Sequence, residues 1–87
     1  MTSRVTERFR RSFRRLPERI QRQALEAYRL WSKDPHHPSL RFKQVHPSKP
    51  VYSVRVALGW RALGVREEDA MVWFWIGSHA EYDRLVK

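Results

Sequence analysis

The chain has 87 residues, which suits one compact domain with a modest hydrophobic core and leaves no room for a second. It contains no cysteine, so disulfide bonds and thiolate metal sites are excluded, and an intracellular setting is the simpler interpretation. The first residues are charged, and no apolar run is long enough to cross a bilayer. We therefore expect one cytoplasmic domain over residues 1–87 that makes no use of a membrane.

The net charge of +9 is unevenly distributed. Residues 1–45 contain twelve Lys or Arg and four acidic residues, whereas residues 46–87 contain six and five. Clustered cations attract polyanions through counterion release and electrostatic steering. The charge therefore indicates a nucleic acid or an acidic protein as the partner, with solubility alone as the simpler alternative.

Two stripes with helical spacing run from Arg4 to Leu16. The apolar stripe consists of Val5, Phe9, Phe13 and Leu16, and the cationic stripe of Arg4, Arg8, Arg11 and Arg15. Like charges at these spacings repel by a few tenths of a kcal/mol per pair, roughly. This predicts an amphipathic first helix with a basic outer surface, whose charge repulsion a partner would relieve.

A second helix follows the Leu16-Pro17 step, because proline disfavours helix at the residue before it and suits a first helical turn. Ile20, Ala24 and Trp31 continue an apolar stripe to about residue 32, and the proline-rich segment 34–38 ends it. The first half of the chain is thus predicted to be a helical hairpin.

Period-two alternation in the second half predicts four strands over residues 40–45, 51–58, 60–65 and 71–76. Residues 78–86 can form a short helical segment. The predicted fold is α+β, in the order α-α-β-β-β-β, with the helical hairpin packed on a four-stranded antiparallel sheet. Tyr52, Val54 and Val56 should face the helices, and Ser53, Arg55 and Ala57 the opposite side.

A candidate catalytic site lies on that opposite side. Arg55 and Arg61 stand on paired strands and can hold one phosphate between two guanidinium groups, as stabilising a phosphorane during RNA cleavage requires. Cleavage without a metal also needs a base for the ribose 2′-OH and an acid for the leaving oxygen. His79 and Tyr82, after the last strand, are candidates for these roles. The simpler alternative is that the arginines are solvated and the tyrosine packs in the core.

Further residues have two interpretations each. Arg41 and Lys43 extend the basic surface towards RNA, or they are edge-strand charges that discourage aggregation. Trp60 stacks on a base, or it belongs to the core. His36, His37 and His46 lie in loops without a carboxylate or cysteine at ligand spacing, so we expect neither a metal nor another cofactor.

Short motifs in the second half resemble the RelE/ParE superfamily, the toxins of bacterial type II toxin-antitoxin systems. The likeness is carried by residues 40–45 (LRFKQV), 52–56 (YSVRV), 59–63 (GWRAL) and 72–79 (VWFWIGSH), and by Tyr82. The order of elements is also similar. In ribosome-dependent members, basic residues on the middle strands bind the mRNA phosphate, and an Arg or His with a nearby Tyr completes the chemistry. By position these residues are Arg55, Arg61, His79 and Tyr82.

Two positions depart from that pattern, because Ser53 stands where some cleaving members have a lysine, and Tyr82 follows His79 at a shorter spacing. The resemblance implies a ribosome-dependent mRNA endonuclease that inhibits translation. These departures leave open a ParE-type toxin that inhibits DNA gyrase by protein contact, and a degenerate, non-catalytic nucleic-acid-binding module.

The resemblance also implies a cognate antitoxin that folds as it wraps the basic first helix and the exposed sheet. Its expected contacts are Arg4, Arg8, Arg11 and Arg15. The chain would be a monomer when free and a hetero-oligomer with the antitoxin, and its other partners would be the ribosome and mRNA, or gyrase in the alternative.

Overall fold

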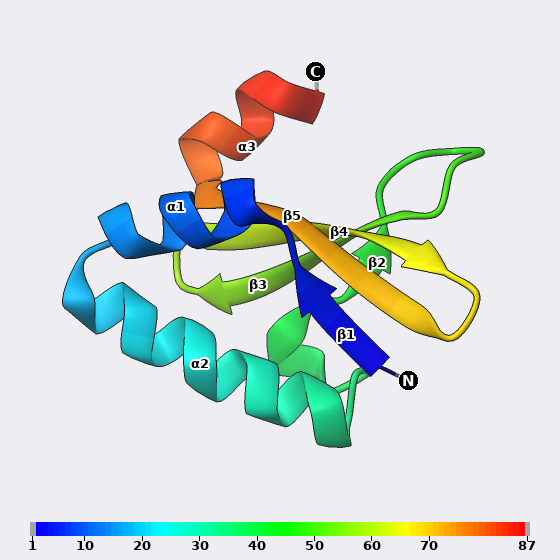
Figure 1. The fold of residues 1–87 in the computed structure, drawn as a ribbon, viewed down its shortest axis with the longest axis horizontal. Helices are drawn as coiled ribbons and strands as arrows, with labels where there is room; N and C mark the ends of the chain where they lie inside the picture. The colour runs from blue at the N-terminus through cyan, green and yellow to red at the C-terminus, as the bar shows by residue number, and fades with distance from the viewer. Residues whose placement is uncertain (1, 87) are drawn as a thin grey trace.

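The computed structural model describes residues 2–86 and forms an α+β fold, as predicted (Figure 1). One sheet has the strand order β1-β5-β4-β3-β2. The elements in chain order are β1 (Thr2–Val5), α1 (Glu7–Arg15), α2 (Glu18–Lys33), the 3₁₀ turn η1 (Pro38–Leu40), β2 (Lys43–Gln44), β3 (Val51–Ala57), β4 (Trp60–Glu67), β5 (Ala70–Ser78) and α3 (His79–Val86).

Within residues 2–86 the sheet has five strands rather than four, because residues 2–5 form the additional strand β1. This strand lies parallel to β5, with Ser3 opposite Met71 and Val5 opposite Trp73. Helix α1 starts only at Glu7, where the Thr6 side chain accepts a hydrogen bond from the backbone N–H of Phe9 at 3.1 Å. The prediction that a helix includes Arg4 and Val5 is therefore wrong, and the basic stripe is divided between a strand and a helix.

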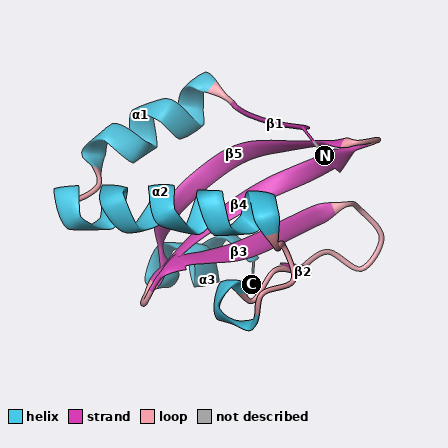
Figure 2. Cartoon of the chain, turned by 90° about the horizontal axis from the view of Figure 1, so that it is seen from below, coloured by secondary structure: helices cyan, strands magenta, loops and turns pink. Residues whose placement is uncertain are grey.

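The two helices lie on one face of the sheet but pack on different strands. Contacts join α1 to β5 and α2 to β3. Figure 2 shows α1 and α2 diverging across this face from the turn at Leu16 and Pro17. The break between the helices was predicted correctly, but the helices do not close on each other as a tight hairpin.

The main core lies between the helices and the sheet. Trp31 and Trp73, each 4% exposed, meet edge to face with ring centroids 5.3 Å apart, and Ile20 and Met71 are buried beside them. Both indole N–H groups are buried and have no hydrogen-bond partner among residues 2–86. The core therefore depends on the packing of aromatic rings and not on polar contacts.

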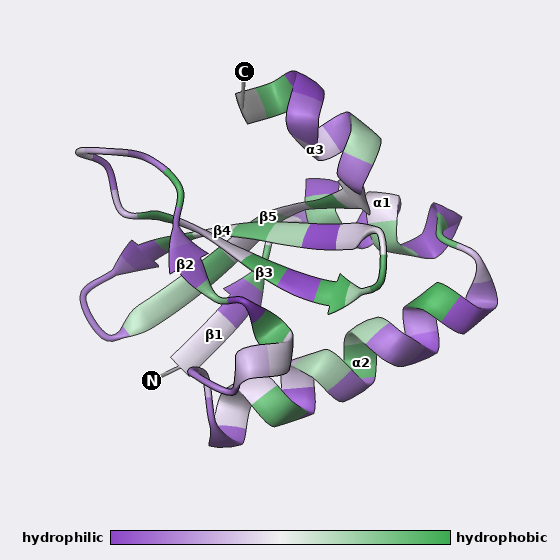
Figure 3. Cartoon of the chain, turned by 180° about the vertical axis from the view of Figure 1, so that it is seen from behind, coloured by the Kyte–Doolittle hydropathy of each residue, from purple (hydrophilic) through white to green (hydrophobic). Residues whose placement is uncertain are grey.

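Strand β3 has the predicted alternation up to Arg55. Val54, Val56 and Tyr52 belong to the core on the helix side, and Figure 3 shows hydrophobic and hydrophilic residues alternating along β3 and α2. Ala57 also packs on that core, contrary to prediction, because the pairing with β4 shifts register between Arg55 and Ala57. Such a β-bulge changes which face the following side chain occupies.

The predicted strand over residues 40–45 is reduced to the two residues of β2. Leu40 is instead the end of η1, where it is 2% exposed, and Arg41 follows in the left-handed conformation with φ 47°. This turn changes the direction of the chain before pairing with β3 begins. It also places Ser39 beside β3, which affects Arg55.

Candidate functional site

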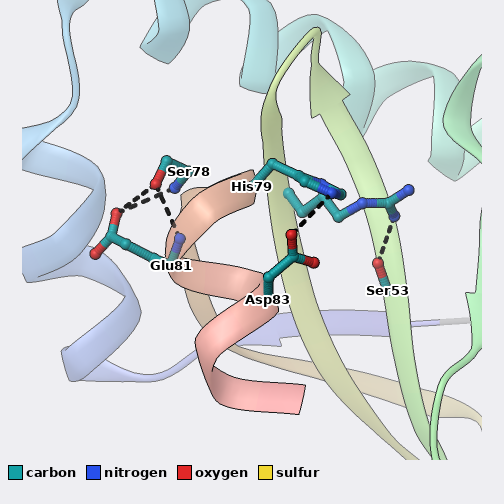
Figure 4. Close-up of polar contacts among 6 residues, drawn as sticks. Ser53, Ser78, His79, Glu81 and Asp83 are labelled. Carbon is teal, nitrogen blue, oxygen red and sulfur yellow. Dashed lines mark hydrogen bonds and ion pairs between the residues drawn. The ribbon is translucent and has the colours of Figure 1, made fainter. Parts of the chain in front are cut away.

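Arg61 is the centre of the candidate site. It lies on β4, its side chain is turned away from α1 and α2, and the residue is only 8% exposed. Its Nη1 donates a hydrogen bond of 2.6 Å to the hydroxyl of Ser53 on β3, marked in Figure 4. The guanidinium carbon lies 5.3 Å from the ring centroid of Tyr82 on α3, a cation–π contact. Ser53 and Tyr82 thus hold the guanidinium from two sides.

The guanidinium has an uncompensated charge. Among residues 2–86, the ion pairs that the structure shows do not include Arg61. A guanidinium has five N–H donors, and a neutral hydroxyl accepts one of them here. A buried cation without a counter-ion is unfavourable, so an anion such as phosphate would be stabilised at this position.

Arg55 is paired with Arg61 across β3 and β4 but its guanidinium is bound elsewhere. Its Nε donates to the backbone carbonyl of Ser39, in η1, at 3.2 Å. The side chain lines a shallow hollow with α2 residues, including Gln23 and Leu30. Arg55 and Arg61 therefore lie opposite each other in the strand register, but their guanidinium groups bind different partners.

Helix α3 covers Arg61, and a capping box fixes where the helix begins. The Ser78 hydroxyl accepts from the Glu81 backbone N–H at 3.2 Å, and the Glu81 carboxylate accepts from the Ser78 backbone N–H at 3.2 Å (Figure 4). The serine hydroxyl also donates to that carboxylate at 3.0 Å. The Ser-His-Ala-Glu sequence at residues 78–81 is the signal for this cap, and our sequence analysis missed it.

His79 occupies the first turn of α3 and is exposed to solvent. Its Nε2 lies 3.5 Å from an oxygen of Asp83, and Figure 4 marks this contact with a dashed line. The ring centroid of His79 is 5.7 Å from that of Tyr82. The His79 backbone N–H donates to the carbonyl of Gly59 at 2.8 Å, which fixes the start of α3 to the turn between β3 and β4. The structure thus places both Arg61 and His79 beside the ring of Tyr82.

The residues predicted to bind RNA are distributed over separate surfaces. Arg41 is exposed in the turn after η1, and Lys43 is exposed on β2 at the edge of the sheet. Trp60 is half-buried and packs against the core on the helix side, whereas Arg61 faces the other side. The indole and the guanidinium of these neighbours therefore occupy opposite faces.

The cations expected to contact an antitoxin are all exposed. Arg4, on β1, forms an ion pair with Glu67 at 3.3 Å, which contributes little because both side chains are solvated. Arg8, Arg11 and Arg15 project from α1 and have no ion pair among those that the described residues form.

Replacing Ser78 by alanine tests the capping box. We expect the change to destabilise α3 by about 0.5–2 kcal/mol, because the Glu81 backbone N–H loses its acceptor and the Glu81 carboxylate loses the serine hydroxyl. Hydrogen exchange of the backbone amides of α3 should accelerate while exchange in β4 stays unchanged. Ser32→Ala, which removes a hydroxyl bonded to the Tyr28 carbonyl within α2, is the control. Unchanged exchange in α3 would show that the cap does not hold this helix.

Within the described residues, no helix is long and apolar enough to cross a membrane. No curated protein matches the chain in sequence.

Several solved structures share the fold. A chain of the RelB-RelE antitoxin-toxin complex from Methanococcus jannaschii has a TM-score of 0.75 and 10% identity, covering 95% of this chain and 98% of that one. YafQ from E. coli has a TM-score of 0.73 and 12% identity, with coverage of 92% and 94%. A chain of the RelBE2 toxin-antitoxin complex from Mycobacterium tuberculosis has a TM-score of 0.71 and 23% identity, with coverage of 90% and 96%.

A match to the sequence shows the family to which the chain belongs. The model of the ParE-like toxin domain matches residues 18–84, from the start of α2 to within α3, and so includes Ser53, Arg61 and Tyr82. The chain therefore belongs to the ParE-like toxin domain family and is a toxin of the RelE/ParE superfamily.

Proposed function

We propose that this toxin is a ribosome-dependent mRNA endonuclease that inhibits translation, cleaving RNA by attack of the ribose 2′-OH without a metal. The observation that carries the proposal is Arg61, a nearly buried cation that makes one side-chain hydrogen bond within the described residues and lies beside Tyr82, whose ring also lies beside His79. This arrangement offers a binding group for a phosphate and two side chains able to transfer protons.

Each residue has a role in this reaction. Arg61 binds the scissile phosphate and stabilises the charge that develops on it. His79 acts as general base or acid, because an imidazole exchanges protons near neutral pH, and Tyr82 serves as the second proton donor or stacks on a base. Arg55 completes the clamp after leaving the Ser39 carbonyl. Arg41, Lys43 and Trp60 contact the RNA further from the scissile bond.

The reaction also requires a change at α3. Arg61 is 8% exposed beneath Tyr82, so a phosphate reaches the guanidinium only when that ring moves aside. Within α3, Tyr82 is buried, whereas His79, Ala80, Glu81 and Leu85 are exposed. Among its described side chains, Tyr82 is therefore the buried contact of α3 with the sheet, and the proposed reaction includes displacement of this helix on the ribosome.

The proposal includes a cognate antitoxin as partner in the cytoplasm. The similar structures include complexes of RelE with RelB from Methanococcus jannaschii, Pyrococcus horikoshii and E. coli. The exposed cations on α1 suit an acidic partner segment. The chain is a monomer when free and forms a hetero-oligomer with the antitoxin.

Inducing the chain in bacteria and mapping the 5′ ends of cellular mRNA by primer extension tests this function. We expect growth arrest together with new cleavage sites inside translated coding regions. Growth without arrest would contradict the proposal and favour a degenerate, non-catalytic module.

The second candidate is a ParE-type toxin that binds and inhibits gyrase. It is favoured by the covering of Arg61, by the bond that directs Arg55 to Ser39, and by the uncharged Ser53. Growth arrest with intact mRNA and an induced DNA damage response would support this candidate and exclude the first.

A further inference from the structure

Ser53 is a buried polar residue on the face of the sheet that carries Arg61. It is 0% exposed and lies within β3. In the strand register Ser53 stands opposite Leu63, and Leu63 stands opposite Trp75, so these side chains form one row across three strands. Leu63 and Trp75 form a small apolar cluster with Tyr82 of α3. A serine adds little to such a cluster, so its hydroxyl indicates a polar role.

The hydroxyl of Ser53 holds the guanidinium of Arg61 by a short hydrogen bond. Arg61 stands opposite Arg55 in the register, two residues along β3 from Ser53. Its side chain therefore runs diagonally across the sheet to bring Nη1 within 2.6 Å of the serine oxygen, and Figure 4 marks this bond. Tyr82 contacts the guanidinium through its ring. Among residues 2–86, Ser53 is thus the hydrogen-bond acceptor that orients Arg61.

The acceptor is neutral, which matters for a cation that binds a phosphate. A carboxylate at this position would form a buried ion pair with Arg61 and neutralise its charge. An apolar side chain would leave Nη1 without this acceptor and allow the long arginine side chain to take other rotamers. A hydroxyl avoids both effects, because it orients the guanidinium and leaves the positive charge for the ligand.

We propose that Ser53 is a positioning residue for phosphate binding by Arg61, and that this role requires a neutral hydrogen-bond acceptor. Ser53 acts through Arg61 and does not itself touch the RNA. It keeps the guanidinium ordered before the phosphate arrives, so that less freedom is lost on binding. The role of Arg61 rests on the proposed function, whereas the hydrogen bond and the burial come from this chain. The serine at position 53 is then part of the site and not a sign of lost activity.

Ser53→Ala tests the positioning role in the purified toxin, with ribosomes on a defined mRNA. We expect kcat to fall about 10–100-fold while KM for the ribosome stays within about twofold, because the ordered guanidinium is needed in the transition state. Ser53→Thr keeps the hydroxyl and should restore kcat. Ser3→Ala, which removes a serine hydroxyl bonded to Tyr28 from the same sheet, is the control and should change neither constant. Circular dichroism establishes that each variant is folded.

Two further variants test the neutrality of the acceptor. Asparagine and aspartate have nearly the same size, and both can accept a hydrogen bond from Nη1, but only aspartate brings a negative charge. We expect kcat of Ser53→Asp to be at least about tenfold below that of Ser53→Asn, because a buried carboxylate neutralises the cation. Equal kcat values for the two folded variants would show that the charge of the acceptor has no effect.

NMR of the toxin alone tests the positioning role independently of cleavage. A hydrogen bond to one Nη slows rotation of a guanidinium, and slow rotation gives separate signals for its N–H groups at low temperature. The Arg61 signals are assigned as those that Arg61→Gln lacks. We expect them to be separate in the wild type and averaged in Ser53→Ala, with Ser3→Ala like the wild type.

Several results would overturn the proposal. They are averaged Arg61 signals in the wild type, an unchanged kcat in Ser53→Ala, or a loss of kcat in Ser53→Ala that folded Ser53→Thr does not restore. A wild-type chain that leaves mRNA intact on ribosomes would contradict the proposed function instead. The Arg61 signals would then decide whether Ser53 orients the guanidinium.

Discussion

Replacing Arg61 by glutamine will remove the toxicity of the chain. The proposed reaction depends on one buried cation to stabilise the phosphate, and loss of such a transition-state contact lowers a rate by about 10²-fold or more. We therefore expect the Arg61→Gln variant, induced in bacteria, to grow normally. Primer extension should show cleavage reduced by at least that factor, about 10²-fold.

Glutamine is chosen so that the variant stays folded. Its side chain is shorter than that of arginine, but it keeps a polar N–H donor on the side of β4 that faces Ser53, which is fully buried. Arg66→Gln is the matched control, because Arg66 is also on β4 but is exposed to solvent. A folded Arg61→Gln protein that still cleaves mRNA at the wild-type rate would exclude Arg61 from the reaction.

Replacing Trp73 by alanine will remove most of the stability of the fold. Truncating a buried tryptophan costs about 3–5 kcal/mol, and a small domain has about 5–15 kcal/mol in total. Trp73 is 4% exposed and meets Trp31 at the centre of the main core. Urea denaturation followed by circular dichroism should show the transition moving to much lower urea concentration.

Trp73→Phe gives a sharper test of what stabilises this core. The indole N–H of Trp73 has no hydrogen-bond partner in the part of the chain that the structure describes, so phenylalanine loses ring area but no polar interaction seen there. We expect its loss in the free energy of unfolding to be well under half of that for alanine. Equal losses for the two variants would contradict the view that ring packing alone stabilises this position.

Most of the fold could be predicted from local patterns in the sequence. The break at Pro17, the helical spacing of Ile20, Ala24 and Trp31, and the alternation around Val54 each gave the correct element. Strand β1 could not be predicted in this way. Its four residues pair in parallel with β5, far along the chain, and that pairing leaves no periodicity within so short a segment.

Local patterns in the sequence predicted the strand or helix on which each site residue lies. They did not predict the direction in which its side chain points. Arg55 and Arg61 are paired in register, as the alternation implied. The direction of each guanidinium depends on distant groups, namely the Ser39 carbonyl for Arg55 and Ser53 with Tyr82 for Arg61. The register shift after Arg55 is a further tertiary effect. By contrast, the capping box at residues 78–81 was readable from the sequence.

Incubation of the purified toxin with ribosomes on a defined mRNA tests the proposed function most directly. Attack by the ribose 2′-OH predicts cleavage that depends on the ribosome and leaves a 2′,3′-cyclic phosphate on one fragment and a 5′-hydroxyl on the other. mRNA that stays intact on ribosomes, with inhibition of purified gyrase by the same preparation, would contradict the account.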